Sequence, residues 1–276
     1  MSNAMQFKAR IKNLALKHNI PAQAVLQNFM LERLLERISL SRYKSKIILK
    51  GGLLVASLVG IQSRTTMDMD TTLQDFPLKE EAIQIVFQEI CAIPVDDGVN
   101  LVVDHIAPIR ADDEYGGFRV AVIASYGAIY TPLKIDITTG DCITPEAVWY
   151  SFPSGFENKA IDILAYNLET ILAEKVETIL HRSVLNTRIR DFYDVYVLMK
   201  THRQSIDKVQ LRVALQNTSQ ARGSLSILAE YENILRIIQA DEVMNQRWVQ
   251  YAKAYTYANG LAFTEVIDPL LEILRS

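Results

Sequence analysis

The stretch KIILKGGLLVASLVGIQSRTTMDMDTTL, residues 46–73, decides the fold because its periodicity changes twice. The apolar run KIILK ends in two glycines, which predicts a short strand that turns sharply into a helix over residues 53–60. A second strand is predicted for MDMDTTL, residues 67–73. The stretch therefore predicts two strands of a sheet with a helix between them.

Two aspartates of this stretch, Asp68 and Asp70, stand two residues apart in the second strand. Side chains at i and i+2 of a strand point to the same face, so both carboxylates project together. Burial of two neighbouring anions is costly unless a cation neutralises them. The alternative interpretation is an exposed strand face on which the two aspartates have no function.

A third aspartate, Asp136, lies between two isoleucines in the later strand PLKIDITT, residues 132–139. If this strand neighbours that of Asp68 and Asp70, three carboxylates converge at one edge. Carboxylate oxygens suit Mg²⁺ (or Mn²⁺), which accepts them together with substrate phosphates. Metal ions held in this way can activate an attacking hydroxyl and stabilise a leaving oxygen. The sequence therefore predicts a metal site at the three aspartates.

The two glycines, Gly51 and Gly52, add a second signal. A glycine turn at a helix N-terminus lets backbone N–H groups approach a phosphate with no Cβ in the way. Each feature alone is weak, but a glycine pair, two spaced aspartates and a later strand aspartate favour a phosphate-binding site.

The rest of the chain predicts an α+β fold, in which a mixed sheet is preceded by helices and followed by a helical half. Two helices precede residue 40, three strands are expected between residues 99 and 140, and the helical pattern returns from about residue 156. We expect a core at residues 5–155, a helical domain at 156–276 and an exposed loop or hinge at 217–224. Residues 1–4 are interpreted as the remnant of a cleaved tag.

Composition is that of an ordinary globular protein. Of the 276 residues 49% are hydrophobic and 22% are charged, and the net charge is −3, which argues against a dedicated nucleic-acid coat protein. The two cysteines, Cys91 and Cys142, lack metal-site spacing. No segment approaches the length of apolar chain needed to span a bilayer, so no membrane partner and a cytoplasmic location are predicted.

Four segments resemble one known family. LKGGLLVASLVGIQSRTTMDMD (49–70) is similar to the opening motif of the DNA polymerase β-type nucleotidyltransferase superfamily, and more narrowly of its AbiEii/AbiGii toxin branch. ILAEKVETILHR (171–182), RIRDFYDVYVL (188–198) and the helical PAQAVLQNFMLERLLERIS (21–39) resemble further parts of that branch. The resemblance covers roughly residues 5–200. Gly-Gly replaces the commoner Gly-Ser, so no serine hydroxyl follows the first glycine.

The resemblance implies roles for individual residues. Asp68, Asp70 and Asp136 would bind metal, and Asp136 would help to deprotonate an acceptor hydroxyl. Lys175 would reach the triphosphate, and Asp191 and Asp194, which share a helix face, would lie at the catalytic cleft. Nucleotide contacts are implied for Gly51, Gly52, Arg64, Thr66, Lys175 and Arg190.

Each of these roles has a plainer alternative. Lys175 could be a surface lysine paired with Glu174 or Glu177. Asp191 and Asp194 could favour a helix start through the helix dipole. Arg64 could be purely structural.

The resemblance implies a metal-dependent enzyme that transfers a nucleotide from an NTP to an acceptor, with the tRNA 3′ end as candidate. It would act as the toxin of a toxin–antitoxin (abortive infection) pair, with an antitoxin encoded nearby. The alternatives are transfer to a small molecule such as an aminoglycoside, or an inert nucleotide-sensing interaction protein. Two basic groups could hold RNA or could be solvated helix ends: Lys44, Lys46 and Lys50, and His181, Arg182, Arg188 and Arg190.

Overall fold

The computed structural model describes residues 2–109 and 116–275, and the chain divides into two compact units. Unit 1 comprises Met1–Asp141 and Val148–Ala165, and unit 2 comprises Cys142–Ala147 and Tyr166–Ser276. The main division therefore falls after residue 165, where the sequence led us to expect it after residue 155. A short segment, 142–147, belongs to the helical unit although it lies between strands of unit 1.

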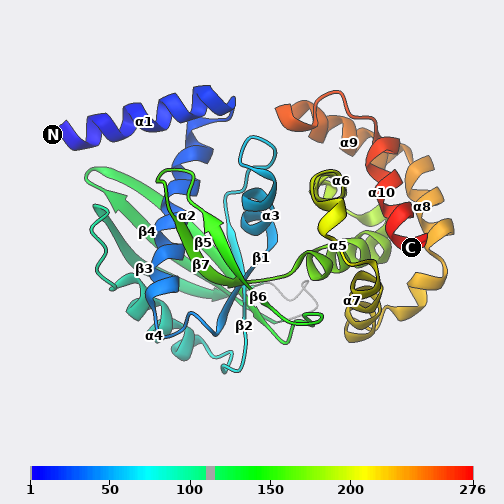
Figure 1. Ribbon diagram of the computed structural model, residues 1–276, viewed down its shortest axis with the longest axis horizontal. Coiled ribbons are helices and arrows are strands. Elements are labelled where there is room, and N and C mark those ends of the chain that lie inside the picture. The colour runs from blue at the N-terminus through cyan, green and yellow to red at the C-terminus, as the bar shows by residue number, and fades with distance from the viewer. Residues whose placement is uncertain (1, 110–115, 276) are drawn as a thin grey trace. The chain divides into compact units, whose positions relative to one another are not determined.

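Unit 1 is built on a mixed sheet in which the order of the described strands is β3-β4-β5-β2-β1-β7-β6 (Figure 1). The central pairs alternate in direction: β1 is antiparallel to β2 and parallel to β7, and β2 is parallel to β5. Their bounds are β1 Ile47–Lys50, β2 Met69–Leu73, β3 Val99–Pro108, β4 Phe118–Tyr126, β5 Ile129–Thr139, β6 Val148–Pro153 and β7 Ala160–Ala165. The predicted α+β class with a mixed sheet is confirmed.

Strands β6 and β7 were not expected, and the prediction of helix from about residue 156 is wrong for its first ten residues. AIDILA forms β7, which pairs with β1 on one side and β6 on the other. Its apolar residues suit both a strand and a helix, and the helix that follows starts only after Asn167. The Asn167 side chain accepts a hydrogen bond from the Thr170 backbone N–H at 2.8 Å, which caps the helix at this point.

The helices described in unit 1 are α1 Ser2–His18, α2 Ala22–Leu40, α3 Gly51–Val59 and α4 Glu80–Cys91. The three residues Ser2–Ala4, interpreted from the sequence as a tag remnant, continue α1. Helix α2 contacts β5, β7 and α4, so it covers the sheet face that buries Val120, Leu133 and Ile135. The opposite face carries Arg119, Lys134 and Asp136, because side chains alternate along β4 and β5.

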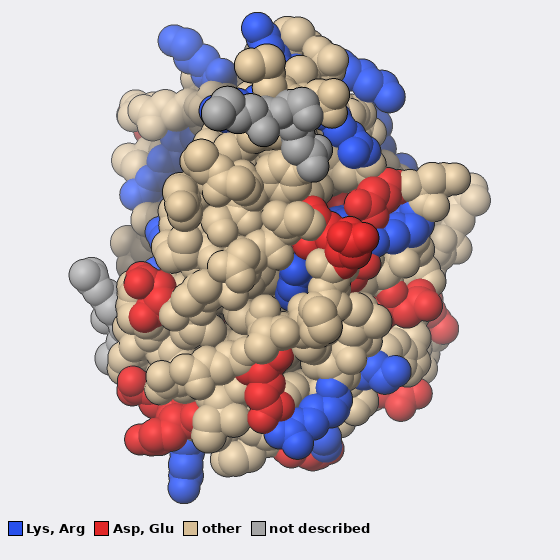
Figure 2. Space-filling model, turned by 90° about the vertical axis from the view of Figure 1, so that its left-hand side faces the viewer, with Lys and Arg blue, Asp and Glu red and all other residues tan. Residues whose placement is uncertain are grey.

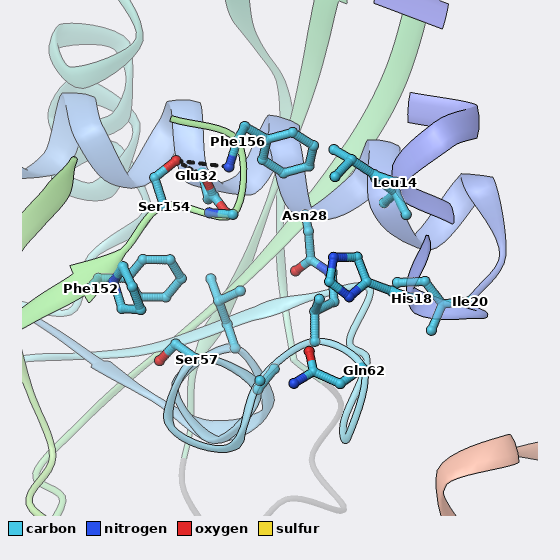
Figure 3. Close-up of a pocket in the computed structure, with 17 residues that line it drawn as sticks. Leu14, His18, Ile20, Asn28, Glu32, Ser57, Gln62, Phe152, Ser154 and Phe156 are labelled. Carbon is cyan, nitrogen blue, oxygen red and sulfur yellow. Dashed lines mark hydrogen bonds between the residues drawn. The ribbon is translucent and has the colours of Figure 1, made fainter. Parts of the chain in front are cut away.

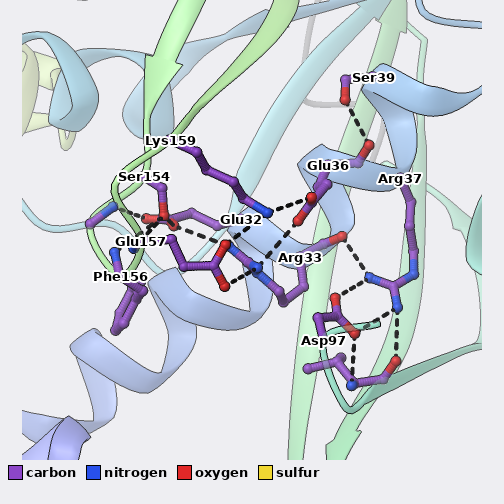
Figure 4. Close-up of polar contacts among 12 residues, drawn as sticks. Glu32, Arg33, Glu36, Arg37, Ser39, Asp97, Ser154, Phe156, Glu157 and Lys159 are labelled. Carbon is purple, nitrogen blue, oxygen red and sulfur yellow. Dashed lines mark hydrogen bonds and ion pairs between the residues drawn. The ribbon is translucent and has the colours of Figure 1, made fainter. Parts of the chain in front are cut away.

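Buried arginines fix α2 to its surroundings (Figure 4). The Arg33 guanidinium, which is completely buried, pairs with Glu157 at 2.9 Å. Arg37 donates to Asp97 at 2.8 and 3.1 Å and to the Val99 carbonyl at 2.8 Å. These bonds tie α2 to the β6–β7 hairpin and to the loop before β3.

Unit 2 is helical. Its helices are α5 Leu168–Arg182, α6 Ile189–His202, α7 Lys208–Ala221, α8 Tyr231–Ala240, α9 Glu242–Ala254 and α10 Phe263–Arg275. The prediction of an exposed loop at 217–224 is wrong, since α7 continues to Ala221 and Ser219 is completely buried. The polar run predicted a loop wrongly because Thr218 and Ser219 lie on the buried side of the helix. Only the turn at Gly223, with φ +65°, resembles the expected break.

Candidate active site

The glycine pair and Asp70 form one structural element. Gly51 opens α3 with φ +67°, a left-handed conformation that side chains rarely adopt. A Cβ at Gly51 would overlap the Asp70 carboxylate, and the Gly52 N–H donates to Asp70 Oδ2 at 3.2 Å. The first turn of α3 therefore places backbone N–H groups and the Asp70 carboxylate beside each other.

Asp68, Asp70 and Asp136 come together on the open face of unit 1. Asp70 and Asp136 are register partners on the parallel strands β2 and β5, and Asp68 lies immediately before β2. Burial and the negative charges of Asp70 and Asp136 raise the pKa of Asp68, while Lys134 and Arg119 oppose this shift. The adjacency of the two strands, on which the sequence prediction depended, is therefore present.

Arg119 supplies the positive charge that the sequence analysis missed. It lies opposite Asp136 in the β4–β5 ladder, and its Nε and Nη2 donate to both Asp136 oxygens at 2.7 Å. The hydrogen bonds and charge of Asp136, with the charges of Asp68 and Asp70, raise the pKa of Arg119. The alternation FRVAVIASY carried a signal, because it places Arg119 on the face opposite the buried valines.

Arg64 and Thr66 surround Gly52. Both are buried, and a Cβ at Gly52 would lie 2.8 Å from Thr66 Oγ1 and 3.1 Å from Arg64 Nη2. Arg64 donates to the Thr65 carbonyl, and Thr66 Oγ1 donates to the Asp68 carbonyl at 3.3 Å. Both side chains thus support the backbone between the glycine turn and the aspartates.

Gln27 of α2 bonds to the backbone next to Asp68 from the sheet face that α2 covers. Its Nε2 donates to the Met67 carbonyl at 2.8 Å and to the Pro132 carbonyl at 3.1 Å. The side chain is buried, and it joins the residue before Asp68 to the start of β5. The only sequence signal for it is a glutamine on an otherwise apolar helix face.

Lys50 and Lys46 of the expected basic group have acidic partners. Lys50 Nζ lies 2.6 Å from Asp141 Oδ2, and Lys46 Nζ lies 3.6 Å from Asp75. Burial would raise the pKa of Asp141, but the charge and hydrogen bond of Lys50 outweigh it and the pKa is lowered. Lys50 is therefore a partly buried, neutralised lysine at the start of the glycine turn.

Unit 2 brings together a second group of predicted residues. Lys175 Nζ donates to Asp191 Oδ1 and to Asp194 Oδ2, each at 2.7 Å. Burial lowers the pKa of Lys175, but the charges and hydrogen bonds of the two aspartates outweigh it, and the pKa is raised. The alternative pairing of Lys175 with Glu174 or Glu177 is not observed, because those residues pair with Arg222 at 3.4 and 2.6 Å.

Two arginines at the start of α6 make different contacts. Arg188 Nε donates to Asp191 Oδ2 at 3.0 Å, so it adds a second cation to the Lys175 group. Arg190 donates to the Tyr255 hydroxyl at 2.7 Å and lies over the Tyr255 ring at 5.3 Å. Asp191 lies in the first turn of α6, where the helix-dipole interpretation places it, whereas Asp194 lies beyond that turn.

The donor set of unit 1 fits a divalent cation. Asp68 and Asp70 are oxygen donors, and the raised pKa of Asp68 marks a local excess of negative charge that a cation relieves. The described residues hold no group of three His, Cys, Asp or Glu side chains close enough to bind a metal as they stand. Asp136 in particular has both oxygens engaged by Arg119.

Comparison with known proteins defines the class. MenT4, the nucleotidyltransferase toxin Rv2826c from Mycobacterium tuberculosis H37Rv, is similar in structure, with a TM-score of 0.57 and 14% identity over 96% of this chain and 98% of that chain. A protein from H. pylori assigned as a nucleotidyltransferase has a TM-score of 0.50 and 16% identity over 93% and 95% of the two chains. These likenesses show a nucleotidyltransferase fold. A search of curated proteins finds no match.

The family follows from the sequence profile. The profile of the nucleotidyl transferase AbiEii toxin family, type IV toxin–antitoxin system, matches residues 33–269. The chain therefore belongs to this family, as the resemblance predicted, and it is a nucleotidyltransferase. Membership implies an NTP as substrate and a paired antitoxin. Among the described residues no helix is long and apolar enough to cross a membrane.

Proposed function

We propose that the protein transfers a nucleotide from an NTP to the 3′ end of a tRNA, as the toxin of its toxin–antitoxin pair. The acceptor hydroxyl would attack the α-phosphorus, lose its proton and displace pyrophosphate. The observation that carries this proposal is the junction of the glycine turn with Asp70, beside Asp68 and Asp136. Backbone N–H groups for phosphate and carboxylates for a cation meet there.

Asp68 and Asp70 are the residues that would hold a divalent metal, Mg²⁺ or Mn²⁺. When bound, the ion supplies positive charge to the reacting phosphates. Backbone N–H groups of the α3 turn would orient the phosphates, and Thr66 and Gln27 would keep Asp68 in place. Arg119 donates to both Asp136 oxygens, so it would compete with a metal ion or with the acceptor's proton for Asp136.

Lys175, Asp191 and Asp194 are proposed to act as one unit. The two carboxylates hold the ammonium at 2.7 Å, so Lys175 would serve nucleotide binding as a positioned group rather than a mobile one. Arg190 is proposed to contact nucleotide in the same half of the chain.

An RNA acceptor is supported by the charge of α1. This helix carries Lys8, Arg10, Lys12 and Lys17 and has no acidic residue, although the whole chain has a net charge of −3. Figure 2 views the protein from the left-hand side of Figure 1. Lys and Arg side chains lie along the upper part of this view, at the height of α1 in Figure 1. Basic groups of this kind suit a phosphate backbone.

The test is incubation of the purified protein with each α-³²P-labelled NTP, total tRNA and Mg²⁺, followed by gel analysis. We expect label on tRNA from one preferred NTP and none after EDTA treatment. Label on an added aminoglycoside instead of tRNA would establish the small-molecule alternative. No transfer to either acceptor would contradict the proposed reaction.

A further inference from the structure

Lys134 lies on the same sheet face as the three aspartates of unit 1. It stands two residues before Asp136 in β5, and side chains at i and i+2 of a strand point to the same face. The parallel register of β2 with β5 pairs Met69 with Ile135, so Lys134 lies across from Asp68, the residue just before β2. Lys134 is therefore a neighbour of Asp68 on the open face of unit 1.

Lys134 differs from two other cations that lie near the aspartates. Arg119 donates to both oxygens of Asp136, and Lys50 Nζ lies 2.6 Å from Asp141 Oδ2. The Lys134 side chain is exposed, and it makes no hydrogen bond or ion pair with a residue that the structure describes. Its charge is therefore available to an anion that approaches this face of the sheet.

The pKa of Asp68 reflects the charge of Lys134. Burial raises the pKa of Asp68 most, followed by the negative charge of Asp70. Lys134 is the strongest influence in the opposite direction, and its effect exceeds that of Arg119. Lys134 is therefore close enough to Asp68 to attract a phosphate that binds beside this carboxylate.

The strand order assigns Lys134 to one side of the reaction. β1, which leads into the glycine turn, lies on one side of β2, and β5, which carries Lys134, lies on the other. In the proposed function the NTP phosphates bind at the glycine turn. The attacking hydroxyl and the leaving pyrophosphate of an in-line displacement lie on opposite sides of the reacting phosphorus. The acceptor would therefore approach from the β5 side, where Lys134 lies.

The cavity of unit 1 shown in Figure 3 offers an anionic acceptor no comparable charge. Its volume is about 270 Å³, and His18, Asn28 and Glu32 are among the residues that line it. Its described lining residues include no Lys or Arg and none of the three aspartates. An acceptor phosphate therefore finds its counter-charge on the open sheet face and not in this cavity.

We propose that Lys134 binds the phosphodiester next to the acceptor hydroxyl and thereby makes the enzyme specific for the 3′ end of an RNA strand. This inference rests on the proposed function, and it names a group that recognises the acceptor. The ammonium attracts the phosphodiester as a point charge, and the hydroxyl of the terminal nucleotide then lies beside Asp136. An aminoglycoside is a polycation without a phosphate, so Lys134 disfavours it as an acceptor.

The first experiment compares two acceptors that differ by one charge. One is a short RNA with the sequence of a tRNA 3′ end, and the other has a neutral methylphosphonate in place of its last phosphodiester. The full-length wild type should use the charged RNA with a kcat/KM about tenfold higher, as for one charge-assisted contact. Lys134→Gln should use both RNAs equally, with an unchanged KM for the NTP. Lys134→Arg keeps the charge and should keep the preference.

The second experiment measures binding without catalysis. Fluorescence anisotropy of the labelled RNA, with Mg²⁺ and without NTP, gives the affinity at several salt concentrations. For Lys134→Gln the slope of the logarithm of affinity against the logarithm of salt concentration should be less steep by about 0.7, the value for one phosphate contact of a single strand. Lys79→Gln removes an exposed lysine before α4 and is the matched control, which should resemble the wild type in both experiments.

The outcomes separate this inference from the function on which it rests. If Lys134→Gln keeps the preference for the charged RNA, the role of Lys134 is overturned while transfer to RNA stands. A raised KM for the NTP with an unchanged preference would assign Lys134 to the triphosphate instead. Equal use of the two RNAs by the wild type would also overturn the inference. Labelling of an aminoglycoside and of neither RNA would contradict the proposed function, and the proposed acceptor contact with it.

Discussion

Two groups of carboxylates among the described residues are neutralised in different ways. On the sheet of unit 1, Asp136 has Arg119 as its partner, whereas Asp68 remains crowded by like charge and has a raised pKa. In unit 2, Asp191 and Asp194 share the buried ammonium of Lys175, and Arg188 adds a second cation. The first group retains an excess of negative charge and the second does not.

The difference separates two kinds of charged site. Arg119 is 46% exposed in its side chain and Asp136 is 21% exposed, so water and ions can reach this pair. The Lys175 side chain is 11% exposed, and those of Asp191 and Asp194 are 6% and 1% exposed. An accessible group with unbalanced charge suits the binding of a cation, whereas a buried and balanced group suits the fixing of geometry.

The largest effect is expected for Asp70→Asn. The amide oxygen can still accept from the Gly52 N–H, but the charge proposed to bind metal is lost. Nucleotide transfer should fall by at least about a hundredfold, a loss typical of impaired metal binding. The Tm should hold or rise, because repulsion with Asp68 is relieved. Radiolabel transfer and thermal unfolding measure the two quantities.

Asp75→Asn is the matched control for that variant, since Asp75 is exposed just after β2 and pairs only loosely with Lys46. It should transfer normally. Turnover of the Asp70→Asn protein at the wild-type rate would rule out metal-assisted transfer at this face of the sheet.

Lys175→Met should mainly destabilise the fold, because the Lys175 side chain is buried against two carboxylates. Removal of one partner of a buried pair typically costs about 3–5 kcal/mol of unfolding free energy. Urea denaturation at pH 7 measures it, with Lys200→Met, an exposed lysine on α6, as control.

A second variant separates charge from packing. Lys175→Met combined with Asp191→Asn and Asp194→Asn should recover part of the lost stability, because no buried charge is left unpaired. Since the pKa of Lys175 is raised in the folded protein, its contribution should be complete below about pH 10.4 and be lost only as the pH rises through the folded pKa. Equal stability of Lys175→Met and wild type would show that the pair is energetically neutral.

The two groups also differ in how far the sequence could predict them. Asp70 and Asp136 follow strand alternation, so their common face could be predicted from local pattern, whereas Asp68 lies just before β2 and its place beside them depends on the folded backbone. Arg119 could not be paired with Asp136 in the same way, because the register of β4 against β5 is a property of the folded sheet. Lys175 is identified through resemblance, and its burial against Asp191 and Asp194 depends on the packing of α5 against α6.

The errors in the predicted fold have the same physical origin, because they too depend on contacts that form only in the folded protein. The sequence predicts helix at β7 because AIDILA is a short apolar run that suits both structures. Its pairing with β1 and β6 makes it a strand. The polar segment at 217–224 was read as a loop because burial of Thr218 and Ser219 depends on the packing of α7 within unit 2. Gln27 and Asn28 belong to α2, where a helical pattern does not reveal which polar side chains point inward.

Glu32 sharpens the comparison, because the effect of its burial outweighs the attraction of Arg33, whose Nη2 lies 3.7 Å from Glu32 Oε2. Burial raises its pKa from 4.5 to about 7, so the folded protein binds the proton more tightly than the unfolded chain. Stability should therefore fall as the pH rises from 4.5 to about 7 and level off above. A shift of this size corresponds to about 3 kcal/mol.

Glu32→Gln isolates that effect. Relative to this variant, the wild type should lose about 3 kcal/mol of unfolding free energy between pH 4.5 and 7.5, measured by urea denaturation at several pH values. Glu81→Gln, at an exposed position in the first turn of α4, should follow the wild type at every pH. A constant difference between wild type and Glu32→Gln across this range would show that Glu32 keeps an ordinary pKa.

The smallest effect is expected for Arg119→Gln, and it tests whether Arg119 and a metal ion compete for the same carboxylates. Both Asp136 oxygens accept from Arg119, and its charge also opposes the shift in Asp68. Removal of this cation should tighten Mn²⁺ binding by about five- to tenfold, a modest value because the guanidinium is half exposed. Stability should change by less than about 1 kcal/mol, as for other exposed ion pairs. Electron paramagnetic resonance of free Mn²⁺ gives the affinity, and Arg42→Gln, which removes an exposed arginine paired with Glu89, should leave it unchanged. Weaker Mn²⁺ binding in Arg119→Gln would mean instead that Arg119 holds Asp136 in the position from which it binds the metal, and the sheet group would then resemble the fixed geometry around Lys175.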